Sequence, residues 1–194
     1  MAALSPRIAL ILAGGGGKRM GGADKGALML DGERLIDRAI ARLAPQVDRI
    51  LISGSHDYAA GLTVVPDCDD GPRGPAAGLF AALKWVEENE PEAAGFLSIP
   101  VDGPFMPDNL FSRLFSPSGS AVAATKAGVH PTFAFWRCDA LAGALSTEAA
   151  DYGWPLKELA DSVHAARILF EDETAFLNIN TREDLQRAEA LLAR

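Results

Sequence analysis

The feature that most constrains this chain is a short apolar run that opens directly into a glycine-rich loop. The run Ile8–Leu12 has the length and composition of a buried strand, and four consecutive glycines follow at positions 14–17. Glycine has no Cβ atom, so backbone N–H groups in such a loop can approach an anionic ligand closely. Lys18, Arg19 and Lys25 add positive charge. The stretch predicts a phosphate-binding loop at a strand end, rather than a flexible loop with a solvated basic cluster.

Two common phosphate-binding loops do not fit this stretch. The P-loop pattern needs a glycine five residues before Gly17 and a hydroxyl residue after Lys18, whereas the chain has Leu12 and Arg19 there. The dinucleotide fingerprint, started at Gly14, would put Arg19 where a third glycine lets a helix pack on the strand. The loop is therefore of another type.

The rest of the chain alternates apolar runs with amphipathic segments. We expect helices at 35–43, 79–89, 139–148, 154–161 and 182–192, and strands at 8–12, 49–53, 62–65, 96–99, 121–125, 131–136, 167–170 and 176–178. Such strand–helix–strand units predict a three-layer αβα sandwich around a mostly parallel, Rossmann-like sheet. With 194 residues, we expect one domain over 1–194. Ligands of such sheets bind at the carboxyl ends of the strands.

Several candidate site residues stand at these strand ends. Ser53 and Asp67 each follow an apolar run, and Asp102 follows another between two prolines. An ionised carboxylate at such a position suits a Mg²⁺ ion held between protein and triphosphate. The alternative, that Asp102 caps the next helix, is weakened because Asp108 stands at that helix start. Gly78, in Gly-Pro-x-x-Gly, lets the backbone approach either a ligand or an adjacent helix.

Four motifs occur in the order in which a known enzyme family carries them. They are Leu12-Ala-Gly-Gly-x-x-x-Arg-Met-Gly-x-x-Asp-Lys25, Gly74-Pro-x-x-Gly78, Pro100-x-Asp-x-Pro104 and Asn178-x-Asn-Thr181. With these motifs, nearly the whole chain resembles the molybdenum cofactor guanylyltransferases of the nucleotidyltransferase superfamily. The resemblance implies transfer of GMP from GTP to the terminal phosphate of molybdopterin, with Mg²⁺ as cofactor and pyrophosphate as product. Such chemistry needs positioning and charge neutralisation rather than a side-chain nucleophile.

The resemblance also implies roles for particular residues. Arg19, Lys25 and Asp102 would be catalytic, and Asp102 would bind the metal. The nucleotide would contact Leu12, Ala13, Gly14, Gly15, Lys25, Ser53, Asp67, Gly78 and Asp102. His130, Asn178 and Asn180 would lie by the second substrate. Independently of the resemblance, residues 149–153, the loop between two expected helices, are a candidate lid or rim for a second ligand. The chain departs from the family pattern at Gly103, commonly threonine, and at Ser53, more often asparagine.

Two alternatives compete with guanylyl transfer. The first is the related cytidylyltransferase, whose opening loop usually resembles Leu-Ala-Ala-Gly, whereas this chain has Leu12-Ala-Gly-Gly15. The second is a non-catalytic nucleotide-binding protein for cofactor delivery. Such a protein would have no need to keep both Lys25 and Asp102.

Composition limits partners and location. A net charge of −8 argues against a broad basic face for nucleic acid, so local cations must meet an anionic ligand. Cys68 and Cys138 lack metal-ligand spacing, and the apolar N-terminal run is too short for a secretory signal or a membrane span. We expect a cytoplasmic monomer that binds neither nucleic acid nor membrane. Its partners would be GTP, molybdopterin and, from the resemblance, molybdoenzyme apoproteins or their chaperones.

Overall fold

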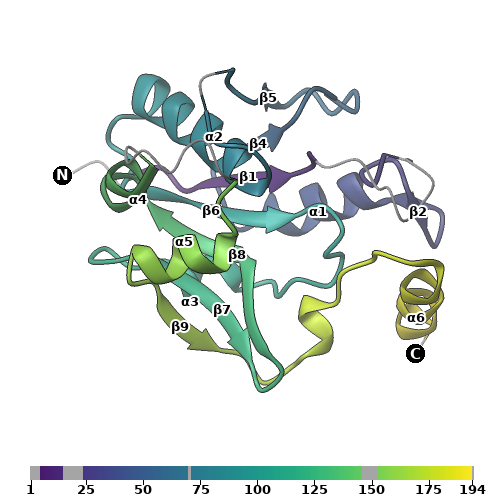
Figure 1. The fold of residues 1–194 in the computed structure, drawn as a ribbon. Helices are drawn as coiled ribbons and strands as arrows, with labels where there is room; N and C mark the ends of the chain where they lie inside the picture. Colours follow the sequence, from purple (N-terminus) through teal and green to yellow (C-terminus); the bar gives the residue numbers. More distant parts are fainter. Residues whose placement is uncertain (1–4, 15–23, 70, 146–152, 194) are drawn as a thin grey trace.

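A seven-stranded sheet forms the centre of the protein (Figure 1). The structure, a computed structural model, describes residues 5–14, 24–69, 71–145 and 153–193. In chain order the strands of this sheet are β1 (Ile8–Leu12), β4 (Arg49–Ser53), β5 (Thr63–Val65), β6 (Gly95–Pro100), β7 (Ala121–Thr125), β8 (Gly128–Arg137) and β9 (Ala166–Leu169). Their spatial order is β5-β4-β1-β6-β8-β7-β9, and of these seven strands only β8 runs against its neighbours. The mostly parallel sheet is confirmed.

Helices cover both faces of the sheet, because strand residues alternate between two cores. Ala9 and Ile11 of β1 belong to the core that contains α1 (Leu35–Leu43) and α3 (Leu110–Leu114). Ile8 and Leu10 belong to the opposite core, beneath α2 (Pro75–Asn89), α4 (Cys138–Leu145) and α5 (Leu156–Ser162). The predicted αβα sandwich is therefore confirmed. Among the helices described, none is long and apolar enough to cross a membrane.

The helix α2 begins one turn earlier than the sequence pattern indicates. We expected residue 79 as its first residue, whereas the helix starts at Pro75, directly after Gly74 with φ of 74°. Proline suits the first helical position because its φ is preset and its missing N–H would have no helical partner there. The early start buries Ala76, Ala77 and Gly78 against the sheet.

The strands β7 and β8 form a hairpin that reaches the carboxyl edge of the sheet. A two-residue turn, Lys126–Ala127, joins them, and Thr125 pairs with Gly128. The register shifts beyond the pair Ala123 and His130, next to Pro131, which has no N–H to give to the ladder. Because β8 is antiparallel, its first residues lie at the edge where the parallel strands end.

The C-terminal segment returns to the first half of the chain (Figure 1). A strand was expected at 176–178, and this prediction is wrong: Thr174–Phe176 is a 3₁₀ helix, and the residues after it join no strand ladder. Instead, the N–H of Ile179 donates to the Asp102 carbonyl over 2.9 Å, at the end of β6. The helix α6 (Arg182–Leu192) then packs beside the small hairpin of β2 (Met29–Leu30) and β3 (Glu33–Arg34).

Candidate active site

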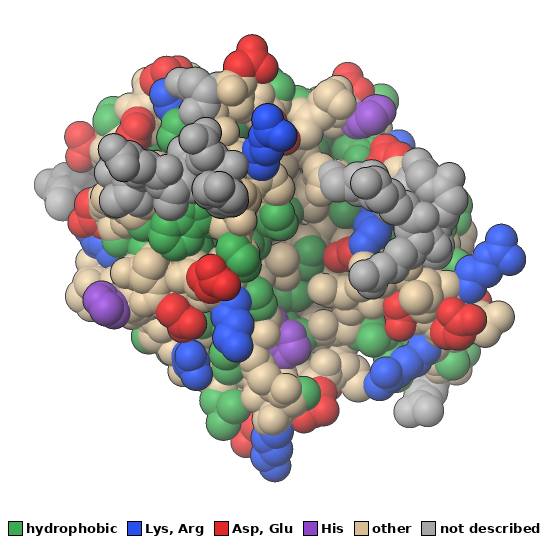
Figure 2. Space-filling model, viewed as in Figure 1, with side chains coloured by type: hydrophobic (Ala, Val, Ile, Leu, Met, Phe, Trp, Pro, Cys, Tyr) green, Lys and Arg blue, Asp and Glu red, His purple; other side chains and the backbone are tan. Residues whose placement is uncertain are grey.

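Lys25, Asp102 and Asn180 meet at the carboxyl edge of the sheet. The Lys25 Nζ lies 2.6 Å from Asp102 Oδ2 and 2.6 Å from Asn180 Oδ1, although 77 and 155 residues separate them along the chain. The side chains of Lys25 and Asp102 keep 20% and 11% of their exposed surface, so the ion pair is largely withdrawn from water. Figure 2 shows this side of the molecule hollowed, with acidic and basic side chains meeting beside the grey residues. Three of the predicted site residues therefore form one cluster.

Local structure holds in place Asp102 and Asn180, whose oxygens accept the hydrogen bonds of Lys25. Asp102 follows β6 and is 7% exposed. Asn180 precedes α6, and its backbone N–H donates to Asp184 Oδ2 over 3.0 Å. Asp184 also completes the capping box with Thr181, and these backbone and side-chain donors lower the pKa of its carboxyl. The start of α6 thus fixes Asn180.

The glycine at position 103 is explained by packing. A Cβ atom at this position would lie 2.5 Å from the Cζ atom of Phe133. The ring of Phe133 is fully buried in the core beneath the site. A side chain at 103 would therefore push against the core next to Asp102.

The oxygen atoms around this cluster suit a hard divalent cation. The cluster itself supplies the Asp102 carboxylate and the Asn180 amide. Two residues before Asn180 in the chain, the Oδ1 atom of Asn178 is buried and has no hydrogen-bond partner among the described residues. A buried acceptor without a partner is costly, and a cation or a ligand donor would remove that cost. Within the described ranges, no three His, Cys, Asp or Glu side chains converge on one point. One carboxylate with amide oxygens fits an ion that also binds substrate phosphates.

The ends of β1 and β4 provide a floor made of backbone. The expected nucleotide contacts Leu12, Ala13 and Gly14 end β1 and begin its loop, whereas Gly15 and Arg19 lie outside the described residues. A Cβ atom on Gly54, whose φ is 115°, would lie 3.7 Å from the backbone of Gly14. With so little side-chain bulk, a ligand can lie directly against the main chain here.

Ser53 and Gly78 pack against each other beneath this floor. Ser53 is 3% exposed, and a Cβ atom on Gly78 would lie 2.6 Å from the Ser53 Oγ and 3.1 Å from a methyl carbon of Leu12. Close helix–strand contact therefore accounts for the glycine at position 78, which was one of the two roles considered. Both residues remain predicted nucleotide contacts.

Asp67 stands apart from the lysine cluster. It follows β5, which is two strands away from β1 in the sheet, and its side chain is exposed. Partial desolvation by its surroundings raises the pKa of its carboxyl. Its predicted contact with the nucleotide would be at the rim of the site.

His130 links the β7–β8 hairpin to the segment that leads from Phe176 to Asn178 and Asn180. Its Nε2 lies 3.0 Å from Thr125 Oγ1, and its ring stacks on Phe176 with centroids 4.7 Å apart. Burial lowers the pKa of His130, and the charge of Glu173 opposes this effect. The imidazole is therefore neutral at pH 7. Its role beside the second substrate stays a prediction, and residues 149–152 of the expected rim lie outside the described part.

Tyr58, which contacts the lysine loop (residues 24–28), could not be identified from the sequence. Its hydroxyl donates to Asp24 Oδ1 over 2.8 Å. Tyr58 belongs to the loop after β4, and only turn-forming composition was visible there. A contact across 34 residues between two loops leaves no periodic pattern that a single sequence could reveal.

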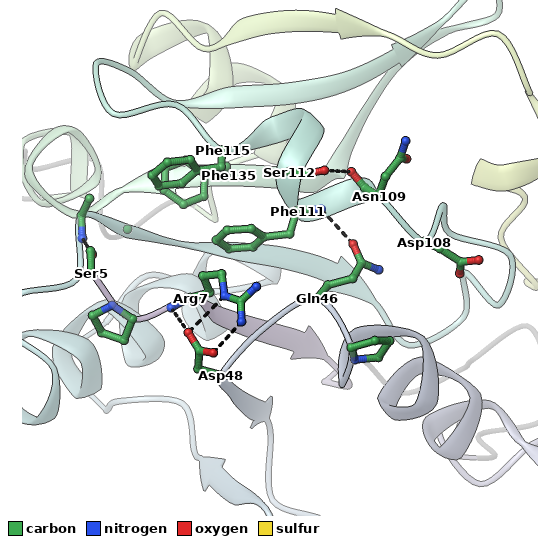
Figure 3. A pocket seen from close by; sticks show the side chains of 14 residues that line it. Ser5, Arg7, Gln46, Asp48, Asp108, Asn109, Phe111, Ser112, Phe115 and Phe135 are labelled. Atoms are coloured by element: carbon green, nitrogen blue, oxygen red, sulfur yellow. Dashed lines mark hydrogen bonds and ion pairs between the residues drawn. The ribbon is translucent and has the colours of Figure 1, made fainter. Parts of the chain in front are cut away.

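A pocket of about 880 Å³ lies at the opposite, amino edge of the sheet (Figure 3). One wall is the aromatic cluster of Phe111, Phe115 and Phe135. Arg7 donates two side-chain hydrogen bonds to Asp48, 3.2 and 2.7 Å long, and these hold the pKa of Asp48 at about 2. Because these two charges neutralise each other, the described residues that line the pocket offer no uncompensated cation to a phosphate.

The carboxyl edge combines a bare backbone floor, a lysine and oxygen donors for a hard cation. On this fold, that combination defines the class of nucleotidyltransferases, which transfer a nucleotidyl group from a nucleoside triphosphate to an acceptor. The chain belongs to the MobA-like NTP transferase family, whose model matches residues 9–164. The resemblance expected from the four motifs is confirmed.

Relatives agree with this assignment. The chain is 41% identical to a molybdenum cofactor guanylyltransferase of Cereibacter sphaeroides, over 94% of this chain and 95% of that protein. Among solved structures, it resembles molybdopterin-guanine dinucleotide biosynthesis protein A from Archaeoglobus fulgidus, with a TM-score of 0.70, 21% identity, and coverage of 96% and 98%. It also resembles a Mycobacterium tuberculosis protein solved with manganese, with a TM-score of 0.69, 15% identity, and coverage of 95% and 98%.

Proposed function

We propose that this protein transfers GMP from GTP to the terminal phosphate of molybdopterin and releases pyrophosphate. The observation that carries the proposal is the cluster of Lys25, Asp102 and Asn180 at the carboxyl edge of the sheet. The choice of guanine and of the pterin substrate rests on the similarity to guanylyltransferases over most of the chain.

The chemistry needs no side-chain nucleophile. The terminal phosphate of molybdopterin, already anionic, attacks the α-phosphorus of GTP in line, and the bond to pyrophosphate breaks. The protein must align the two phosphates and stabilise the charge that moves onto the leaving group. Lys25 and Arg19 would supply positive charge. The loop after β1 would supply backbone N–H groups.

The site residues fit Mg²⁺, which would be held by Asp102 and by the amide oxygens of Asn178 and Asn180. A bound Mg²⁺ neutralises phosphate charge and orients the triphosphate. The manganese in the structure of the Mycobacterium tuberculosis protein supports a divalent ion in this fold.

The two halves of the domain would take different substrates. The nucleotide would lie on Leu12, Ala13 and Gly14, with Ser53 and Asp67 nearest its base. The pterin substrate would lie on the β7–β8 side, near His130. We take the monomer as the active unit, with molybdoenzyme apoproteins or their chaperones as recipients of the product.

A thermal-shift panel of GTP, CTP, ATP and UTP with Mg²⁺ tests the choice of base. A nucleotide at 100 times its dissociation constant adds about 2.7 kcal/mol, which is roughly 5 to 10 °C in Tm for a chain of this size. We expect a shift of this size for GTP and a much smaller one for the other nucleotides. Equal stabilisation by CTP would favour cytidylyl transfer.

Pyrophosphate release tests the transfer itself. We expect release from GTP to require molybdopterin and to stop in Asp102→Asn, which removes one charge without changing volume. A protein that binds GTP but releases no pyrophosphate with the pterin present would be a delivery protein and not a transferase.

A further inference from the structure

The hydroxyl of Tyr58 binds Asp24, the residue that precedes Lys25. The Tyr58 hydroxyl donates to Asp24 Oδ1 over 2.8 Å, and the same oxygen accepts the N–H of Gly26 over 2.9 Å. Burial, followed by the neighbouring Asp24, raises the pKa of Tyr58, so the phenol remains a proton donor at neutral pH. Two donors therefore fix the carboxylate that immediately precedes Lys25.

The ring of Tyr58 packs against Gly26, the residue that follows Lys25. A Cβ atom on Gly26 would lie 2.5 Å from Cζ of the ring, so only glycine leaves room for the tyrosine. The carbonyl of Gly26 accepts the N–H of Ile36, and the carbonyl of Lys25 accepts the N–H of Leu28, both over 3.1 Å. The main chain around the lysine is thus pinned between the start of α1 and Tyr58.

The loop that carries Tyr58 is itself shaped for this contact. Tyr58 and Ala59 both have φ of 53°, in the left-handed region, which costs free energy for residues other than glycine. Nη1 of Arg34 donates to the Tyr58 carbonyl over 3.1 Å, and the same guanidinium is held by Asp37 at 2.6 and 2.8 Å. These interactions maintain a strained backbone that directs the ring onto the lysine loop.

We propose that Tyr58 is a positioning residue for catalysis: its hydroxyl and ring fix the backbone on both sides of Lys25 and so aim the ammonium at the phosphate chain. This proposal rests on the proposed function, since it assigns Lys25 to the triphosphate. Tyr58 acts through Asp24 and Gly26 and needs no contact with substrate.

The first test replaces Tyr58 by phenylalanine, which keeps the ring and removes the hydroxyl. We expect kcat for GMP transfer to fall about threefold to tenfold, the range that the loss of one hydrogen bond allows. The KM for GTP should stay nearly unchanged, because the nucleotide itself is not contacted. His56→Ala is the matched control, since this exposed side chain lies in the same loop with its ring centroid 6.0 Å from that of Tyr58. It should leave kcat unaltered.

The second test measures Lys25 without any turnover. Limited acetylation followed by mass spectrometry gives the labelling rate of Lys25 relative to the exposed Lys126 and Lys157. In Tyr58→Phe we expect Lys25 to be labelled about threefold to tenfold faster, because its ammonium leaves Asp102 and Asn180 more often. Unchanged labelling and unchanged kcat would overturn the proposal.

A double-mutant cycle guards against a variant that merely folds poorly. Gly26→Ala should reduce kcat in the wild-type background, because its methyl group displaces the ring. In a Tyr58→Ala background the methyl group has room, so the same change should cost nothing further. Additive losses would contradict the proposal.

Failure of this proposal can be told apart from failure of the proposed function. If the wild-type protein transfers no GMP but Tyr58→Phe still speeds Lys25 labelling, the positioning contact stands and the assigned reaction is wrong. If KM rises while labelling stays constant, Tyr58 contacts the nucleotide and is not a positioning residue.

Discussion

Replacing Lys25 by methionine tests whether its ammonium occupies the place that a divalent cation needs. The Nζ atom bonds to Asp102 Oδ2 and Asn180 Oδ1, two of the oxygens that would bind the metal. Methionine keeps an unbranched chain and loses the charge. The variant therefore leaves the Asp102 carboxylate without its cation.

The expected loss of stability follows from the burial of the pair. Removing one partner of a fully buried ion pair costs about 3 to 5 kcal/mol. Lys25 and Asp102 keep 20% and 11% side-chain exposure, so water compensates part of the lost interaction. We expect a loss of about 2 kcal/mol, or roughly 4 to 8 °C in Tm for a chain of this length.

A metal ion should reverse this loss in the variant. With EDTA, Lys25→Met should melt below the wild type, and Mn²⁺ or Mg²⁺ should raise its Tm more than that of the wild type, where the ammonium competes. GMP transfer should nevertheless fall by about 10²-fold, as for the loss of one preorganised donor to developing charge. Differential scanning fluorimetry and the pyrophosphate assay measure the two effects separately.

The double variant Lys25→Met with Asp102→Asn is the matched control. It lacks both charges, so it should regain part of the lost stability and show little response to metal. If Mn²⁺ stabilises the wild type and Lys25→Met equally, the ammonium and the metal do not share oxygens and the reasoning is refuted.

Three further predictions concern packing, pH and capping. Gly78→Ala should lower the free energy of unfolding by about 1 to 3 kcal/mol because its methyl group would contact Ser53. Adding Ser53→Ala to this variant should recover part of the loss, as measured by urea titration. An unaltered urea midpoint in Gly78→Ala would contradict the packing. The lowered pKa of His130 means that the unfolded chain binds more protons below about pH 6.5. The free energy of unfolding should therefore fall as the pH is lowered from 7.5 to 5.5, and it should fall less in His130→Gln, as measured by the same urea titrations. Equal pH slopes of stability in the two proteins would exclude this cause. Thr181→Ala should cost about 1 kcal/mol through the lost helix cap, measured by thermal circular dichroism, and an unchanged Tm would show that Asp184 holds the helix start unaided.

Much of the first half of the fold could be predicted because its signals are local. The run 8–12 alternates between two cores without any polar residue, which is the pattern of a strand buried on both faces. Parallel strands end at one edge, so Asp102 and the glycine loop could be placed together from their positions after strands. The meeting of Lys25 with Asn180 required the family motif as well, because no local pattern relates residues 155 apart.

The parts that could not be predicted depend on long-range contacts. Phe176 and Leu177 have the apolar character of a strand, yet Phe176 ends a 3₁₀ helix and its ring stacks on His130. Tyr58 is a similar case, since its importance lies in a partner on another loop. Arg19 and Gly15 lie outside the described residues, so their roles stay predictions.

The reversed direction of β8 separates the site into two parts with different capacity to vary. Each parallel strand must be followed by a connection, and a connection such as residues 66–74 can change in length without disturbing the sheet. In the hairpin half of the site, the chain passes through a two-residue turn and continues at once as β8, whose backbone pairs with β7. Insertions can therefore remodel the first half, whereas the hairpin half can change its ligand contacts mainly by exchanging side chains at fixed positions.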